Sequence, residues 1–325
     1  MNQVFAIITL TLTLVAPNLF QPPQGSKTAA AAAVPASRVI DAGKLFEDVR
    51  VLSDDAMEGR RAGTPGGTRA RAYVVRRFSE AGLKPFVGAS YEQAVELGGS
   101  GKELRGGNVV GYVRGAKHPE RFVVVTAHYD HLGVRGGQVY NGADDNASGV
   151  AALLAMAAHF SRRQPDNSLV FAALDNEEGG GAGARTLVKS LLEAKRSVSL
   201  NVNLDMVSHS ERGELYASGT YHHPSLKPLV ERVAARARVK LLLGHDRPEP
   251  RGEDWTMQSD HQAFHREKIP FVYFGVEDHK DYHRPSDDFA TITREFFVRA
   301  TETILDAVET FDENLPAIEK PQGTR

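Results

Sequence analysis

Five residues of types that bind metal ions are spread through this 325-residue chain, each in a polar segment close to an apolar run. Their side chains are two imidazoles and three carboxylates, a donor set that suits a pair of zinc ions. The candidate ligands are His128, Asp144, Glu178, Asp205 and His283. One more carboxylate, that of Glu177, stands beside a candidate ligand and remains free to act as a base. The set predicts a hydrolase in which metal ions activate water.

Taken singly, each candidate has an ordinary structural explanation. The adjacent carboxylates Asp144 and Asp145 could cap the following helix and complement its dipole. A histidine after a strand, such as His128, is more often a polar residue at the rim of a sheet than a ligand. The set as a whole is more informative, because its members complete two metal sites and each lies in a suitable local context.

Two of the candidates also have settings that favour metal binding. A metal-bound imidazole needs its second ring nitrogen held, usually by a carboxylate, and Asp130 is the predicted partner of His128. Asp205 lies at the end of an apolar run, where an unpaired buried carboxylate would be costly. A cation is the simplest partner for Asp205.

The elements that must position these residues alternate along the chain. Continuous apolar, β-branched runs predict buried strands, and helical periodicity predicts the helices between them. We expect strands at 122–126, 168–174, 199–206 and 270–275, and helices at 41–52, 69–81, 147–160, 183–192, 224–237 and 294–311. This order predicts an α/β fold of three layers, with a central, mostly parallel (mixed) sheet between helices. Ligands bind at the carboxyl ends of such strands, so we expect the candidates at one rim.

Composition narrows the function further. The net charge is −2 and the lysines and arginines are not clustered, so we expect no nucleic-acid partner. The absence of cysteine excludes disulfides, thiolate zinc sites and cysteine nucleophiles.

The N-terminal residues predict export to the periplasm or the medium. The apolar run 5–16 is too short for a stable membrane span and is typical of a signal peptide, although no lysine or arginine precedes it. A start codon assigned too early is the alternative. Residues 21–37 are of low complexity and resemble a disordered tether. We therefore expect a signal peptide and tether at 1–37 and a single domain at 38–325.

The ordered set resembles the co-catalytic di-zinc aminopeptidase family, number twenty-eight among the metallopeptidases, and its exported bacterial members. The segments that carry the resemblance are 127–133, 142–149, 176–178, 204–206, 259–261 and 281–283, and it extends to 52–66. The resemblance as a whole covers roughly residues 45–311, almost all of the predicted domain.

The resemblance implies a role for each candidate. Asp144 would bridge two zinc ions, with His128 and Asp205 completing one site and Glu178 and His283 the other. Glu177 would be the general base, and Tyr282 would polarise the scissile carbonyl. The peptide bond between Asp144 and Asp145 would be cis. The implied enzyme is a zinc aminopeptidase that removes N-terminal residues from peptides with a free N-terminus.

Two other classes of function remain open. The first is a glutaminyl-cyclase-like acyltransferase with one zinc, whose members typically lack the second Asp and the Asn of the sequence at 144–149. The second is a binding module with a dead metal site, against which the intact set and Glu177 argue. Ala155 and Gln258 replace a Glu and an Arg that many relatives carry, which leaves the substrate preference open.

Other residues of interest have predominantly structural explanations. We expect His131 to be structural or to line the pocket, and the pair His222 and His223 to be solvated. Three apolar residues could either line a specificity pocket or pack in the core: Trp255, Met257 and Phe264.

Overall fold

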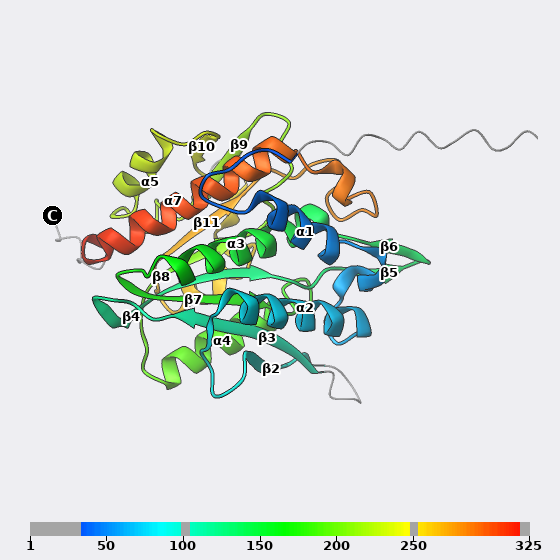
Figure 1. Cartoon of the computed structure of the whole chain (residues 1–325), viewed down its shortest axis with the longest axis horizontal. Coiled ribbons are helices and arrows are strands. Elements are labelled where there is room, and N and C mark those ends of the chain that lie inside the picture. Colours follow the sequence, from blue (N-terminus) through cyan, green and yellow to red (C-terminus); the bar gives the residue numbers. More distant parts are fainter. Residues whose placement is uncertain (1–33, 99–104, 248–252, 319–325) are drawn as a thin grey trace, which may run out of the picture. The chain divides into compact units, whose positions relative to one another are not determined.

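A mixed sheet of nine strands forms the centre of the described chain (Figure 1). The computed structural model describes residues 34–98, 105–247 and 253–318. The strands of this sheet are β1 (Lys84–Pro85), β2 (Glu92–Glu96), β3 (Arg105–Val113), β4 (His118–His128), β7 (Asn167–Leu174), β8 (Ser197–Leu204), β9 (Glu214–Ser218), β10 (Lys240–Leu243) and β11 (Phe271–Gly275). Strands β5 (Gly133–Arg135) and β6 (Gln138–Tyr140) form a separate hairpin.

The order across the sheet is β1-β3-β7-β4-β8-β11-β9-β10, with β2 paired to β3. The four central strands β7, β4, β8 and β11 are parallel to one another, whereas β3 is antiparallel to β7 and β9 is antiparallel to β11. The mostly parallel, mixed sheet expected from the sequence is thus confirmed. Because the central strands run in one direction, the loops at their carboxyl ends meet at one rim.

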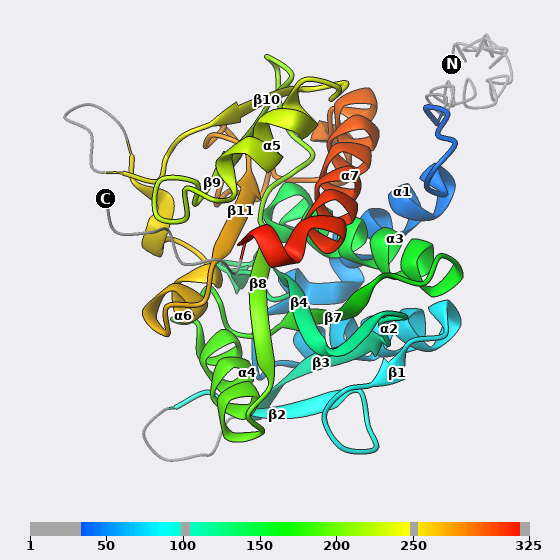
Figure 2. The same ribbon diagram turned by 90° about the vertical axis from the view of Figure 1, so that its left-hand side faces the viewer.

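Helices cover both faces of the sheet (Figure 2). They are α1 (Ala42–Leu52), α2 (Pro65–Ala81), α3 (Gly149–Arg162), α4 (Ala182–Glu193), α5 (Lys227–Ala234), α6 (His261–Arg266) and α7 (Arg294–Ile318). Alternate residues of β4 face opposite layers: Val123 and Val125 belong to the core under α3 and α7, and Val124 to the core under α4 and α6. Both faces of the central strands are therefore buried, as continuous apolar runs predict.

All the expected strands and helices are present, with shifted ends. Helix α2 begins four residues before its expected start, because Pro65 stands in its first turn and the Thr64 hydroxyl accepts a hydrogen bond from the N–H of Gly67 at 3.3 Å. Strand β3 was not expected, since three glycines weaken its strand signal. At one of them, Gly106, a Cβ atom would lie 2.4 Å from the carboxylate of Asp175, so the close approach of these segments requires glycine.

Residues from Val34 onward form one compact unit. The predicted signal peptide and most of the predicted tether fall on residues 1–33, which lie outside the described residues. Residues 34–37 are described, and the carbonyl of Ala36 accepts a hydrogen bond from Arg299 at 3.3 Å. Within the described part of the chain, no helix has the length and apolar character needed to cross a membrane.

Candidate metal centre

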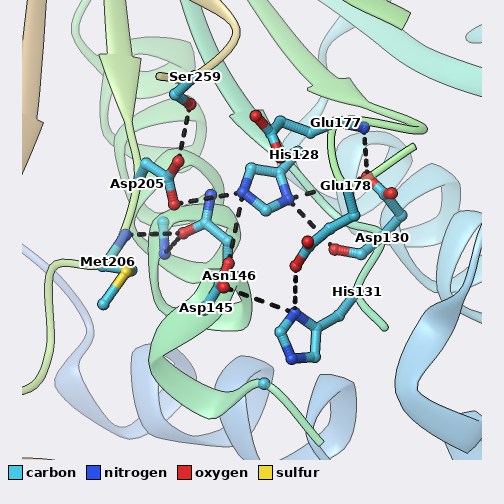
Figure 3. Close-up of polar contacts among 12 residues, drawn as sticks. His128, Asp130, His131, Asp145, Asn146, Glu177, Glu178, Asp205, Met206 and Ser259 are labelled. Atoms are coloured by element: carbon cyan, nitrogen blue, oxygen red, sulfur yellow. Dashed lines mark hydrogen bonds and ion pairs between the residues drawn. The ribbon is translucent and has the colours of Figure 1, made fainter. Parts of the chain in front are cut away.

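The loops that follow the four central strands bring most of the predicted site residues together. Figure 3 shows His128, Glu177, Glu178 and Asp205 among them. His128 is the last residue of β4, Glu177 and Glu178 follow β7, Asp205 follows β8, and His283 lies in the loop after β11. These strands are neighbours in the order β7-β4-β8-β11, so residues far apart in sequence share one rim. The structure thus places these five residues at one rim, and their roles as ligands and base stay predictions.

The structure corrects the prediction for Asp144. Its neighbour Asp145 faces the other candidates, while the Asp144 carboxylate points elsewhere. Asp144 Oδ1 accepts hydrogen bonds from the N–H and the hydroxyl of Ser208 at 2.7 and 2.8 Å, and Oδ2 lies 3.2 Å from Nε2 of His279. The cis peptide bond joins Asp145 and Asn146, one position later than expected. Adjacent side chains project in different directions, so the choice between the two aspartates depends on the backbone path before α3.

A first group of donor atoms surrounds Nε2 of His128. Asp205 Oδ1 lies 3.2 Å from this nitrogen, and Asp145 Oδ1 lies 3.5 Å from it. Ligand atoms about 2.1 Å from a tetrahedral zinc ion are roughly 3.4 Å apart. The separations in this group fit such an ion.

A second group forms around the other oxygen of Asp145. Nε2 of His283 lies 3.1 Å from Asp145 Oδ2 and 3.4 Å from Glu178 Oε2. The buried ring of His131 is also close, with Nδ1 2.7 Å from Glu178 Oε1 and 3.6 Å from Asp145 Oδ2. His131 Nδ1 and Glu178 Oε1 make no hydrogen bond, although their 2.7 Å separation is shorter than the usual spacing of two ligands on one ion. His131, Asp145 and Glu178 lie close enough together to hold an ion, so His131 is a candidate ligand of this group beside His283.

Neighbouring groups hold these side chains in place. Nδ1 of His128 lies 3.2 Å from the main-chain carbonyl oxygen of Asp130 and 3.8 Å from its Oδ1, so the carbonyl, rather than the predicted carboxylate, is the nearer partner. The Asp130 carboxylate instead accepts a hydrogen bond from the N–H of Glu177 at 3.0 Å. The hydroxyl of Ser259 donates to Asp205 Oδ2 at 2.7 Å. Asp130 therefore ties the loop after β4 to the loop after β7.

Sequence reasoning missed Asp287. Its carboxylate is fully buried and accepts hydrogen bonds from the N–H groups of Asp144 and Asp145, at 2.9 and 3.0 Å. Burial and these two aspartates raise its pKa to about 7. No local pattern around Asp287 distinguishes it from other loop aspartates, so only the fold reveals that it holds the backbone of Asp145.

The electrostatics of the site favour cations. Burial lowers the pKa of His128, but Asp205, Glu177 and Asp145 together raise it well above its ordinary value. Burial likewise opposes the charge of His283, yet Asp145 and Glu178 raise its pKa to about 10. Protons on these two rings balance part of the negative charge of the neighbouring carboxylates. A site of this kind would exchange the protons for metal ions.

Glu177 differs from the other carboxylates of the site. Burial raises its pKa well above the ordinary value, His128 lowers it, and Asp260 and Asp205 raise it again. Glu177 lines the same small cavity as Asp145, Tyr282 and His283. A carboxylate next to the candidate ligands is placed to exchange a proton with a water bound there.

The other predicted residues of the cavity separate into two kinds. The Tyr282 ring stacks on His283 with ring centres 3.9 Å apart, and its hydroxyl keeps its proton because burial raises its pKa. Trp255 is buried and lines the cavity together with Gln258. Met257 is 42% exposed, and Phe264 is buried in the core under α4. Neither belongs to the described residues that line this cavity.

A further group of potential ligands lies at His209, His279 and Asp281. The two imidazoles stack face to face, with centres 3.9 Å apart and planes inclined by 8°. The lone pairs of an imidazole lie in the ring plane, so rings stacked in this way cannot both direct a nitrogen at one ion. The Asp281 carboxylate already pairs with Lys280 at 2.6 Å.

Comparison with known proteins agrees with this geometry. The chain is 33% identical over 156 residues to a probable zinc metalloprotease of Leptosphaeria maculans, covering 46% of this chain and 36% of that protein. It is 30% identical over 218 residues to aminopeptidase YwaD of Bacillus subtilis, covering 62% of this chain and 44% of the relative. The chain therefore spans less than half the length of these relatives.

Solved structures share the fold. The zinc aminopeptidase BSAP from Bacillus subtilis superimposes with a TM-score of 0.67 at 18% identity, over 84% of this chain and 96% of that one. A glutaminyl cyclase from Bacteroides thetaiotaomicron gives the same TM-score and identity, over 85% of this chain and 99% of that one. At this identity the structures establish the fold alone.

The model of peptidase family M28 matches residues 108–308, more than half of the chain. The matched region contains every residue of the two donor groups as well as Glu177 and Tyr282. The chain belongs to peptidase family M28.

Proposed function

We propose that the protein is a zinc aminopeptidase with two metal ions in its site. The observation that carries this proposal is the placement of Asp145, whose two carboxylate oxygens face separate groups of donors. His128 and Asp205 would hold one ion with Asp145 Oδ1, and Glu178 and His283 would hold the other with Asp145 Oδ2. Imidazole nitrogens and carboxylate oxygens are the ligands that zinc takes in hydrolytic enzymes.

When bound, the two zinc ions would lower the pKa of the attacking water and polarise the scissile carbonyl. Glu177 would take the proton of that water and pass it to the amine that leaves. Its pKa is raised by burial, so it holds a proton more readily than an exposed glutamate does, as the second step requires. The Tyr282 hydroxyl would donate a hydrogen bond to the oxygen on which negative charge develops.

A glutaminyl-cyclase-like acyltransferase shares this fold, so the fold does not separate the two activities. The donor set does favour one of them. A single ion needs only one of the two groups around Asp145, and this chain contains both.

Two measurements on purified protein test the proposal. Metal analysis should give close to two zinc ions per chain, whereas about one would favour the cyclase and none a binding module. Hydrolysis of a series of aminoacyl amides should proceed, and the N-acetylated amides should not react because they lack a free N-terminus. Turnover of the acetylated series at equal rates would refute the aminopeptidase assignment.

We also propose that the protein is exported, on the basis of the apolar run at 5–16. The mature protein from the periplasm or medium should begin within or after residues 21–37, as mass spectrometry of its N-terminal peptide would show. Recovery of the uncleaved chain in the cytoplasm alone would refute this proposal.

A further inference from the structure

Arg60 is a completely buried arginine that reaches two loops of the proposed metal centre. All five N–H groups of its guanidinium donate to main-chain carbonyl oxygens. The acceptors are the carbonyls of Tyr129 at 2.8 Å, Leu52 at 2.6 Å, Asn141 at 2.5 Å, Gly142 at 2.9 Å and Asp145 at 3.5 Å. Arginine has five such donors in a rigid planar fork, so every one is used.

Four of these five carbonyls belong to the segments that carry the donor atoms, and the fifth, that of Leu52, ends α1. Tyr129 lies between His128 and Asp130, and the loop from Asn141 to Asp145 ends in the residue that both donor groups share. One planar group therefore sets the distance between the loop after β4 and the loop before α3. A lysine at this position has three donors on a flexible stem and could not satisfy the same five acceptors.

The chain near Arg60 adopts an unusual conformation. Glu58, Gly59 and Arg60 have φ angles of 50°, 61° and 51°, in the left-handed region that non-glycine residues seldom occupy. At Gly59 a Cβ atom would lie 2.4 Å from the carbonyl oxygen of Tyr140. The segment Asp55–Arg60 is thus pressed against the β5–β6 hairpin in a conformation that its own sequence does not favour, and this conformation directs the Arg60 side chain inward.

The charge of Arg60 also bears on the site. Burial lowers its pKa to about 10, while the carboxylates of Asp145, Asp287, Asp130 and Glu178 act in the opposite direction. The guanidinium therefore stays protonated at neutral pH. It places a fixed positive charge behind a group of buried carboxylates.

We propose that Arg60 is a positioning residue, which holds the loops of His128 and Asp145 at the spacing that two metal ions require. This inference rests on the proposed function. Groups that orient metal ligands without binding the metal typically contribute about 10- to 100-fold to metal affinity. Arg60 would act on both ions at once, because it holds the carbonyl of the shared residue Asp145.

The test compares Arg60→Lys with Arg77→Lys by zinc competition against a chelator and by the visible spectrum of the cobalt-loaded proteins. Arg77 is a matched control, because its guanidinium pairs with Asp48 of α1 at 2.7 Å and contacts none of the site loops through its described partners. We expect Arg60→Lys to bind zinc about 10- to 100-fold more weakly and to alter the cobalt spectrum. Arg77→Lys should lower the unfolding temperature but leave both readouts unchanged. Wild-type affinity and spectrum in Arg60→Lys would overturn the proposal.

Hydrogen exchange of the wild-type protein provides an independent test if Arg60→Lys does not fold. After the metal is removed, the amides of Tyr129, Asp144 and Asp145, which bond to Leu174 and Asp287, should stay protected, because Arg60 still holds carbonyl oxygens of the same two loops. Rapid exchange of these amides, with the central strands still protected, would overturn the proposal. Wild-type protein that binds no zinc would refute the proposed function. If the wild type binds two zinc ions and Arg60→Lys binds them with the same affinity, only the role of Arg60 is refuted.

Discussion

Two regions of the molecule are rich in histidine, and they hold their imidazoles in opposite states. In the candidate metal centre, carboxylates raise the pKa values of His128 and His283. The second region is an aromatic histidine cluster that consists of His222, His223, His261 and His265 around Phe271. Here burial lowers the pKa of His223 to about 4 and that of His261 to about 3.

The neighbours of the rings explain this difference. His222 and His265 have ring centres 4.8 Å apart, and His261 lies 4.8 Å from the centre of Phe271. Burial disfavours the charged form of His223, His261 and His265, so these three imidazoles behave as packing groups. The expectation that His222 and His223 are solvated is wrong, since both are half-buried in this cluster. A histidine in this fold is suited to metal binding where carboxylates face it.

The largest expected effect separates proton transfer from metal binding within the metal centre. Glu177→Gln should keep both zinc ions and lose about 100- to 10,000-fold in turnover, because an amide of the same shape cannot accept the proton. Metal analysis and steady-state kinetics on one preparation check this result. A fully metallated variant with near-normal turnover would exclude Glu177 as the general base.

The next prediction distinguishes two adjacent residues. Asp145→Asn should weaken both zinc sites by more than the roughly 10- to 100-fold typical of groups that only orient ligands, because Asp145 faces both donor groups. Asp144→Asn is the matched control and should retain both ions, since its carboxylate binds Ser208. Titration with zinc under competition by a chelator measures both affinities. The opposite result would restore the original assignment of Asp144.

A pH experiment probes the aromatic histidine cluster. His261 stays neutral in the folded protein down to about pH 3, whereas in the unfolded chain it takes up a proton below its ordinary value of 6.5. The free energy of unfolding therefore decreases as the pH falls from 6.5 toward 3, because the unfolded chain gains a proton at His261 that the folded protein does not bind. Relative to His261→Gln, the folding equilibrium constant of the wild type should fall by up to about tenfold per pH unit in this range.

Urea unfolding of both proteins at pH 7 and pH 5, in the presence of a chelator, measures this difference without a contribution from bound metal. A free-energy difference between wild type and His261→Gln that does not change with pH would show that His261 is not held neutral by burial.

The smallest effect is expected at His223. Its Nε2 atom is buried and has no hydrogen-bond partner among the described residues. His223→Leu therefore removes an unsatisfied polar atom and should change the free energy of unfolding by no more than about 1 kcal/mol. Zinc content and turnover should be unchanged. A loss of zinc in this variant would break the distinction between the two histidine regions.

The sequence by itself determined the class of fold and the kinds of ligand. Apolar runs mark the buried central strands, and polar residues such as His128, Glu178 and Asp205 follow directly at their ends. Because parallel strands end at one rim, the sequence order of these residues was enough to predict that they meet. Strand β3 and the start of α2 were less predictable, since glycines and a capped proline turn depend on the neighbours they pack against.

Only the tertiary structure decided which donors face one another. Asp144 and Asp145 are chemically identical, and the path of the backbone before α3 directs Asp145 into the site and Asp144 toward Ser208. Asp287 and Arg60 support that path from distant parts of the chain through hydrogen bonds to main-chain atoms. Such bonds leave no mark in a local pattern, because the main chain offers the same atoms at nearly every position.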